Sequence, residues 1–408
     1  MKKTSFPLDL SALAYPMMKT RRTQSNFRFS VRLNSPVRPD ALERALSDVI
    51  VHYPNLNARI APSFFWHKFK QNDAPLLVKQ DDRPPLTPLR KADTNGYPFR
   101  LAYKENEIVL EVFHAATDGD IGALFLSDLL TRYVKIVQDC LPSADTDRGL
   151  ILEDAFIKNA NKKSLFNVSL RKYNGSASLA LGKRGNYLDS PTLLSTEIAV
   201  EDLKASAKSW GATVTEYISA CYISAILKEQ SLPLKKPIRL FVPVNLRRFF
   251  PSDTLQNFVC FERITLAKGE ADDSFEHILD LVHRQFAEKI TKETMQRHVD
   301  DVKRCFSLPL VKYLPLFIKM PCFKLIKKIT NKVRQTAILS NIGKVTLPPE
   351  AAAHVLDVKF YLNVSKNAPL NVAVLSYGDF CHVDLTCGLK QSEIPDRFFA
   401  LLKNQGKK

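Results

Sequence analysis

One segment combines residue types that proton-transfer chemistry needs. Residues 113–120 read Phe-His-Ala-Ala-Thr-Asp-Gly-Asp and stand between an alternating apolar segment and an apolar helical pattern. The imidazole of His114 titrates near neutral pH, so at the end of a strand it can act as a general base in an open cleft. Asp118 is near enough to orient the turn or to pair with an arginine. Gly119 removes side-chain bulk and permits unusual backbone angles.

A structural role fits the same residues. His114 would then be a histidine whose hydrogen bonds are satisfied in a tight turn, and Asp118 would cap the helix that follows. The start of that helix carries a partial positive charge, which favours negative charge nearby in either case. The residues alone leave both roles open.

The elements that must position this segment follow from the hydrophobic pattern. Alternation of apolar and polar residues predicts strands over 27–33 and 107–114. Helices are expected from Pro39 to Pro54 and from about Asp120 to Val137. In the second half we expect further strands over 193–200, 238–242, 258–266, 355–364, 370–376 and 381–386, with helices over 213–229, over 275–294 and from 392. Helices and strands mix in each half, which indicates an α/β protein.

Length and composition indicate two domains. A chain of 408 residues with 45% hydrophobic residues is too long for one ordinary core. Residues 140–190 carry few long apolar runs, several Gly and Ser, and a basic bias, which is typical of a connection. We therefore predict an N-terminal subdomain over 1–165, a linker over 166–190 and a C-terminal subdomain over 191–408.

The formal net charge of +17 favours anionic partners such as phosphates, acidic proteins, nucleic acid or an anionic membrane. Nucleic acid is disfavoured because the basic residues are interleaved with aliphatic rather than stacking aromatic side chains. The chain lacks the motifs G-x-G-x-x-G, G-x-x-x-x-G-K-[ST], G-x-S-x-G and H-E-x-x-H. Dinucleotide, P-loop, α/β-hydrolase and common zinc-protease chemistry are therefore disfavoured.

The seven cysteines include no C-x-x-C pair. This spacing argues against a thiolate metal site or a disulfide framework and fits a reducing compartment. Pro7, Asp9 and Pro16 interrupt any apolar run after the start, so we expect no cleaved signal and a cytoplasmic location.

Three segments together resemble a known superfamily. His114-x-x-x-Asp118-Gly119 after a strand is similar to the active-site motif of the chloramphenicol acetyltransferase-like superfamily. That superfamily includes peptide-synthetase condensation domains, plant acyltransferases and bacterial alcohol acetyltransferases. Residues 242–258, which contain Pro-Val-Asn-Leu-Arg and Asn-Phe, and residues 339–343, Leu-Ser-Asn-Ile-Gly, resemble segments of the bacterial alcohol acetyltransferase group. The resemblance covers nearly the whole chain.

Two departures favour the stand-alone bacterial group. Condensation domains usually carry a second histidine directly before the catalytic one, whereas this chain has Phe113. Plant members carry Asp-Phe-Gly-Trp-Gly near the C-terminus, whereas residues 376–380 read Ser-Tyr-Gly-Asp-Phe, for which we predict only a hairpin turn.

The resemblance implies two chloramphenicol acetyltransferase-like subdomains, each a mixed sheet with flanking helices, with an active-site tunnel between them. His114 would take the proton of an alcohol or amine that attacks an acyl-coenzyme A thioester, without a covalent enzyme intermediate, a bound cofactor or a metal. Asp118 would be held by Arg247, with Arg248 as the second candidate. The remaining site residues are assigned to substrate binding: Asn257, Ser340 and Asn341.

The oxyanion of the reaction needs a hydrogen-bond donor, and Ser340 or Asn341 could supply it. A turn in which Asn341 and Gly343 only satisfy local backbone groups fits the same residues. Two further functions stay open: transfer from an acyl carrier protein, and a non-catalytic relative that binds an acyl or lipid ligand. We expect a monomer.

A basic stretch stands apart from the motif. No acidic residue occurs between Asp301 and Glu350, and aliphatic residues alternate with Lys303, Arg304, Lys312, Lys319, Lys324, Lys327, Lys328, Lys332 and Arg334. Such a segment can lie in the interface of an anionic membrane. It can also dock the phosphates of coenzyme A or an acidic carrier, or form the solvated face of a core helix.

Overall fold

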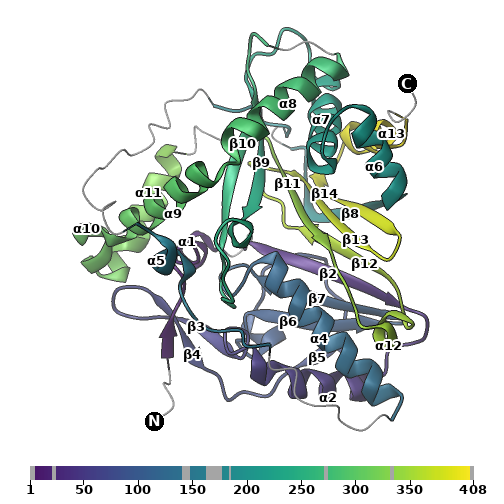
Figure 1. Ribbon diagram of the computed structural model, residues 1–408. Coiled ribbons are helices and arrows are strands. Elements are labelled where there is room, and N and C mark those ends of the chain that lie inside the picture. The colour runs from purple at the N-terminus through teal and green to yellow at the C-terminus, as the bar shows by residue number, and fades with distance from the viewer. Residues whose placement is uncertain are drawn as a thin grey trace.

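Two mixed sheets, in the upper and lower halves of Figure 1, carry most of the strands. The computed structural model describes residues 5–20, 24–139, 148–161, 177–182, 185–270, 274–330 and 335–404. Helices cover both sheets, so the expected two-lobed α/β architecture is confirmed. A smaller antiparallel sheet has the strand order β1-β4-β3.

The lower sheet has five strands in the order β12-β2-β7-β6-β5. Their bounds are Val355–Leu362 (β12), Asn26–Leu33 (β2), Glu107–Phe113 (β7), Phe99–Lys104 (β6) and Val78–Gln80 (β5). The pair β5–β6 is parallel and the other pairs are antiparallel, so the sheet is mixed. Its edge strand β12 comes from far along the chain, so the C-terminal part of the sequence completes the sheet that carries His114.

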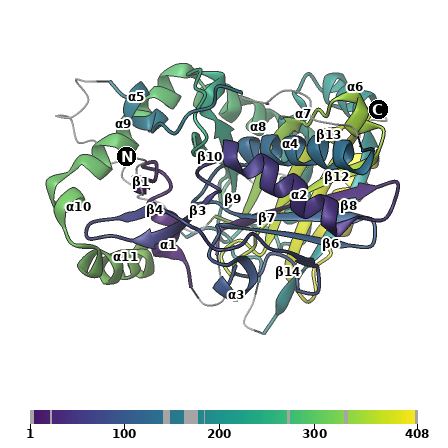
Figure 2. The ribbon, with the colours of Figure 1, turned by 90° about the horizontal axis from the view of Figure 1, so that it is seen from below.

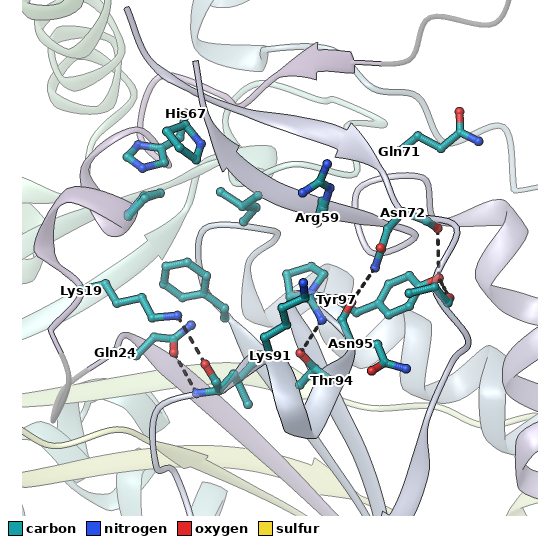
Figure 3. A pocket seen from close by; sticks show the side chains of 18 of the residues that line it. Lys19, Gln24, Arg59, His67, Gln71, Asn72, Lys91, Thr94, Asn95 and Tyr97 are labelled. Carbon is teal, nitrogen blue, oxygen red and sulfur yellow. Dashed lines mark hydrogen bonds between the residues drawn. The ribbon is translucent and has the colours of Figure 1, made fainter. Parts of the chain in front are cut away.

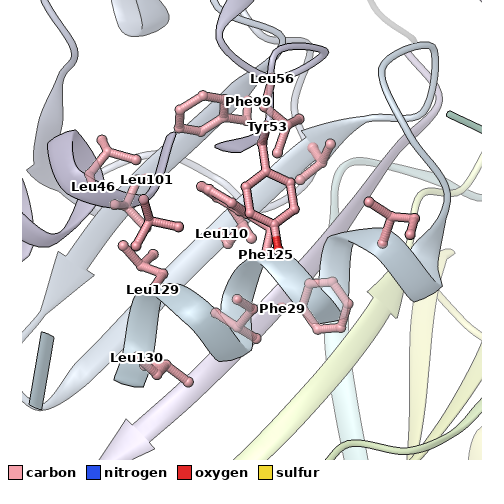
Figure 4. Close-up of a cluster of buried hydrophobic side chains, with 14 of the residues drawn as sticks. Phe29, Leu46, Tyr53, Leu56, Phe99, Leu101, Leu110, Phe125, Leu129 and Leu130 are labelled. Atoms are coloured by element: carbon pink, nitrogen blue, oxygen red, sulfur yellow. The ribbon is translucent and has the colours of Figure 1, made fainter. Parts of the chain in front are cut away.

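Helices α2 (Pro39–Val49) and α4 (Gly119–Val137) cover one face of this sheet (Figure 2). Each presents an apolar stripe at helical spacing, as the sequence predicted. Figure 4 shows Leu46 and Phe125 from these helices packed with Phe29 and Leu110 from the sheet. This packing fixes α4, and with it the turn from β7 that carries the motif.

The upper sheet has six strands in the order β10-β9-β11-β13-β14-β8. Their bounds are Val259–Leu266 (β10), Ile238–Asn245 (β9), Ala337–Lys344 (β11), Leu370–Tyr377 (β13), Phe380–Leu389 (β14) and Tyr187–Ala199 (β8). Strand β11 runs parallel to both of its neighbours, and the other pairs are antiparallel.

Helix α7 (Val214–Lys228) is buried along almost its whole length. It packs on the upper sheet and contacts α6 (Val200–Ser209), α8 (Phe275–Lys289) and α13 (Ile394–Asn404). The predicted capping box at its start is present, because Thr213 accepts from the backbone of Glu216 and Glu216 accepts from that of Thr213.

The remaining elements are shorter or peripheral. They are β1 (Ser5–Pro7), α1 (Ala14–Met18), 3-10 turns at Ile50–His52 and Leu246–Arg248, β3 (Ala58–Pro62), β4 (His67–Gln71), α3 (Lys91–Thr94), α5 (Ala155–Asn159), α9 (Lys292–Ser307), α10 (Pro309–Tyr313), α11 (Leu316–Thr330) and α12 (Pro349–Ala352). Within the described residues, no helix is long and apolar enough to span a bilayer.

Several predicted elements were wrong in detail. The helix expected over 275–294 is two helices, because α8 ends at Lys289 and the Thr291 side chain caps α9. Residues 339–343 are not a turn but part of strand β11, with a bulge between Asn341 and Gly343. The Pro-rich region before residue 107 holds the short strands β3 to β6, whose alternation is too brief to detect.

The hairpin turn predicted at 376–380 is confirmed, since Tyr377 pairs with Phe380 across it. Strand β8 begins at Tyr187 and so takes in the end of the predicted linker, while α5 lies within the segment expected to be a connection. Linker residues 166–176 and 183–184 lie outside the described residues. The division at 165 and 191 stays a prediction.

Candidate active site

His114 directly follows β7, and both its backbone and its ring are held. Its backbone N–H donates to the Ser25 carbonyl oxygen at 2.8 Å. The ring stacks on Tyr15, with centroids 4.8 Å apart and planes 17° from parallel. Phe27 meets the ring edge-on at 5.4 Å. These contacts fix the plane of a half-buried imidazole.

An amide and a carboxylate fix which ring nitrogen carries the proton. Nδ1 of His114 lies 2.8 Å from Oδ1 of Asn257. The Asn257 amide nitrogen lies 3.2 Å from Oδ2 of Asp9, so its donor end faces the carboxylate. Its carbonyl oxygen, which can only accept, therefore faces His114. Nδ1 carries the proton in the neutral ring, and Nε2 keeps its lone pair.

Asp9 is itself held by several donors. Its Oδ1 accepts from the Ser11 hydroxyl at 2.6 Å and from the Ala12 N–H at 2.8 Å. Its Oδ2 also accepts from the backbone N–H of Asn257 at 3.2 Å. Burial raises the pKa of this carboxyl, and the hydrogen bonds oppose that shift.

Burial lowers the pKa of His114 below its usual value of 6.5, because the charged imidazolium is poorly solvated. The charge of Asp118 and the hydrogen bond to Asn257 act in the opposite direction. The shift favours the neutral ring at neutral pH, the state that can accept a proton.

Asp118 lies at the junction of the two halves. Its Oδ1 accepts from the Ile121 N–H at 3.2 Å, so it caps α4 as the structural interpretation predicted. Its Oδ2 accepts from Arg247 Nη1 at 2.7 Å and from the Phe258 N–H at 2.9 Å. The pairing expected with Arg247 is thus present. Arg248, the second candidate, is exposed.

Arg247 extends this junction to the loop before β10. Its Nη2 donates to the carbonyl oxygens of Thr254 and Gln256, at 3.0 and 2.8 Å. The Asp118 side chain is 1% exposed and that of Arg247 14%, so this ion pair is largely removed from water. The turn after β7 and the loop that carries Asn257 are therefore held to one another.

Gly119 allows neighbouring side chains to approach the backbone closely. It is not required for an unusual backbone angle, because the described glycines with positive φ do not include it. A Cβ at this position would lie 3.2 Å from Ile342 Cγ2 and 3.3 Å from Phe360 Cζ. Both contacts are tighter than packed side chains normally make. Gly119 thus removes side-chain bulk, as expected, without using the positive φ that glycine permits.

A cavity of about 380 Å³ opens in front of His114, between the two sheets. Asp118, Gly119, Ser340 and Asn341 also line it. Arg247 and Asn257 do not line this cavity. They form hydrogen bonds to two residues that do, Asp118 and His114. A second cavity of about 1130 Å³ shares lining residues with the first, among them Tyr15, Met18, Ser25 and Phe261.

The two candidate oxyanion donors differ in their contacts. Asn341 donates to the Thr215 hydroxyl at 3.0 Å, and its carbonyl oxygen accepts from the Gly343 N–H at 2.9 Å. The contact with Gly343 lies at the bulge in β11, so the expected hydrogen bond between Asn341 and a local backbone group is present, although in a strand and not in a turn. Ser340 lines the same cavity and is buried.

Another cavity, of about 570 Å³, lies on the other side of the end of β7 (Figure 3). Successive residues of a strand face opposite ways, so Phe113 lines this cavity while His114 lines the one between the sheets. Lys19, Arg59 and Lys91 also line it, as Figure 3 shows. None of the residues predicted for the active site does.

Two residues of this site were not predicted from the sequence. They are Asp9, which the sequence marks only as an interruption of an apolar run, and Tyr15. Their contacts to Asn257 and His114 span long stretches of chain, so no local pattern could reveal them. No group of three or more His, Cys, Asp or Glu that could hold a metal occurs among the described residues.

Comparison with known proteins identifies the family. Residues 150–379, more than half of the chain, match the model of the alcohol acetyltransferase family. No curated protein matches the sequence at a significant level.

Solved structures show the same fold at low sequence identity. The first condensation domain of the CDA synthetase has a TM-score of 0.65 at 14% identity, with 100% of this chain and 97% of that chain covered. A trichothecene 15-O-acetyltransferase from Fusarium sporotrichioides has a TM-score of 0.64 at 10% identity, with 98% and 94% covered.

A third structure, polyketide synthase associated protein 5 from Mycobacterium tuberculosis, has a TM-score of 0.58 at 16% identity, with 94% of both chains covered. The family match and the shared two-lobed fold agree with the resemblance found in the sequence. The chain belongs to the alcohol acetyltransferase family and is an acyltransferase.

Proposed function

We propose that this protein transfers an acyl group from a coenzyme A thioester to an alcohol or amine, with His114 as the general base. The observation that carries the proposal is the hydrogen bond from His114 Nδ1 to Asn257 Oδ1, which leaves the Nε2 lone pair for an acceptor in the cavity. The lowered pKa of His114 supports the same role, because a base must be unprotonated before the reaction.

The reaction then proceeds in two steps at one centre. Nε2 takes the proton of the acceptor hydroxyl or amine as its oxygen or nitrogen forms a bond to the thioester carbonyl carbon. The tetrahedral oxyanion collapses, the carbon–sulfur bond breaks, and the departing thiolate takes the proton from Nε2. No enzyme side chain is acylated, and His114 returns to its starting state.

Ser340 is the stronger candidate for stabilising the oxyanion, because it lines the cavity while the Asn341 side chain, which also lines it, is already hydrogen-bonded to Thr215 and Gly343. Asp118 and Arg247 are positioning residues: they hold the turn of His114 against the loop of Asn257. Asn257 orients the imidazole through its hydrogen bond with Nδ1, and Asp9 holds the Asn257 side chain.

Two alternatives use the same cavity. An acyl carrier protein could deliver the thioester, and the net charge of +17 suits an acidic carrier as well as the phosphates of coenzyme A. A non-catalytic relative would bind an acyl or lipid ligand without turnover. The proposal favours coenzyme A because the family resemblance is to stand-alone enzymes.

The test is thiol release from a panel of acyl-coenzyme A donors, with and without mixed alcohols and amines, in wild type and His114→Ala. Acceptor-dependent release that falls by about a hundredfold or more in the variant would support the proposal. The same panel presented on an acyl carrier protein separates the two donors. Ligand binding without release from either donor would favour the non-catalytic alternative.

A further inference from the structure

Exposed apolar side chains gather at one edge of the molecule. Seven of the fourteen exposed large hydrophobic side chains in the described part of the chain lie on two neighbouring segments, the tip of the β3–β4 hairpin and helices α10–α11. We call them the hairpin–helix face: Phe64, Phe65, Leu310, Tyr313, Phe317, Ile318 and Leu325. Leu310 is 76% exposed and Phe317 72%, so solvent contacts most of these side chains. The rings of Phe64 and Phe65 lie 4.8 Å apart and those of Phe65 and Tyr313 6.2 Å apart, and such a cluster of exposed apolar side chains marks an interaction site.

The fold holds the two segments together. The Leu316 N–H donates to the Phe64 carbonyl oxygen at 2.8 Å. Lys319 Nζ donates to the Phe65 carbonyl oxygen at 2.9 Å and lies 3.2 Å from the centroid of the Trp66 ring. Figures 1 and 2 both place α10 and α11 at the periphery beside the hairpin. The exposed side chains are therefore displayed on a fixed surface.

The two segments that carry this face contain basic but no acidic residues. The sequence has no acidic residue in the hairpin over 58–71 or over 302–349, whereas Lys68 and Lys312 are exposed. The predicted basic stretch continues through Lys324, Lys327 and Lys328, whose side chains are not among those described, and Lys332 and Arg334 lie outside the described residues. Exposed aromatic and aliphatic side chains among lysines suit the boundary between lipid headgroups and acyl chains.

We propose that the hairpin–helix face binds the surface of a bilayer that contains anionic phospholipid. Apolar side chains would enter the interface, and the lysines would contact the headgroup phosphates. A second copy of this chain suits the face less well, because pairing it with itself would bring like charges together.

Packed side chains connect the hairpin of this face to a residue of the larger cavity. Phe306, which lines the 1130 Å³ cavity, contacts the Trp66 ring with centroids 5.6 Å apart. That cavity also contains Tyr15 and Met18, which line the His114 cavity. The hairpin that carries Phe64 and Phe65 therefore packs against a residue that lines this cavity.

The experiment is co-sedimentation of the full chain with vesicles of phosphatidylcholine, with and without phosphatidylglycerol. Wild type is expected to bind the anionic vesicles and to be released by salt. Phe64→Ser/Phe317→Ser should weaken binding by about tenfold or more. Leu356→Ser/Phe380→Ser is the matched control, since these side chains are 52% and 49% exposed on β12 and β14, away from α10 in Figure 1.

Binding requires no turnover, so it is tested separately from the transfer reaction. Equal thermal unfolding of the two double variants would show that lost binding is not lost folding. Failure of wild type to bind anionic vesicles, or equal losses in both double variants, would overturn the proposal. A dimer in light scattering that Phe64→Ser/Phe317→Ser dissociates, with no vesicle binding, would assign the face to a second copy and also overturn it.

Discussion

His114 Nδ1 lies 2.8 Å from Asn257 Oδ1, although the two residues are 143 positions apart in the sequence. Asn257 in turn contacts Asp9, which is 248 positions away in the sequence. The three side chains form one line of hydrogen bonds from a buried carboxyl to the ring that faces the cavity. Since the amide can only accept at Oδ1, this line determines the tautomer of the proposed base.

Replacing Asn257 should therefore change how His114 titrates as well as how fast the enzyme works. We expect Asn257→Ala to lower kcat/KM by about tenfold to a hundredfold, less than His114→Ala. Asn257→Asp places a carboxyl beside the ring and should raise the pKa of His114, which moves the acid limb of the pH–kcat/KM profile upward.

The control for this prediction is Asn161→Ala. It also removes an Asn–Asp contact, to Asp300 at 3.0 Å, but far from His114 in the sequence and outside its cavity. Its pH profile should match that of wild type. An Asn257→Asp enzyme with reduced activity but an unmoved acid limb would argue that Asn257 only supports the fold.

The pH dependence of turnover has a predicted sign. His114 must be neutral to accept a proton, and burial places its pKa below 6.5, so activity should persist at neutral pH and be lost as the pH falls through that lowered pKa. Asp120 lines the same cavity, and burial raises its pKa to about 6. Comparing kcat/KM of wild type and Asp120→Asn separates the two groups. An acid limb above pH 6.5 in Asp120→Asn would contradict the assignment to His114.

The ion pair between Asp118 and Arg247 should contribute strongly to stability. Arg247→Ala leaves a buried carboxylate without its cation, and we expect a loss of about 3–5 kcal/mol in the free energy of unfolding. Arg248→Ala changes an exposed neighbour of the same type and should cost at most about 0.5 kcal/mol. Urea unfolding measures both. Similar losses of unfolding free energy in the two variants would show that the Asp118–Arg247 ion pair does not stabilise the contact between the two halves.

Measurements of turnover and of stability should distinguish the two candidate oxyanion donors. We expect Ser340→Ala to lower kcat by about tenfold to a hundredfold with little change in KM, because the lost contact forms in the transition state. Asn341→Ala removes one hydrogen bond to Gly343 in the β11 bulge and one to Thr215 in α7, and should lower the free energy of unfolding by about 1–3 kcal/mol. If Ser340→Ala keeps the kcat of wild type, another group must donate the hydrogen bond to the oxyanion.

Local patterns in the sequence determined most of the elements around the site. The alternation over 27–33 and the apolar stripe of the helix after Asp118 are set by residues within a few positions of one another. The strand, the turn and the helix that present His114 could therefore be predicted, as could the capping box of α7. The resemblance to the acetyltransferases supplied the pairing of Asp118 with Arg247, which no local pattern contains.

Only the tertiary structure decided what surrounds His114. Tyr15 stacks on its ring and Asp9 contacts Asn257 because the N-terminal segment folds back against the loop before β10. Asn257 hydrogen-bonds to the ring of His114 and does not line the cavity. Strand β12 joins the sheet of the first half, and the apolar residues near 64 and 317 meet at one face. Contacts between segments hundreds of residues apart depend on how the whole chain packs, so the local periodicity that defines each element does not specify them.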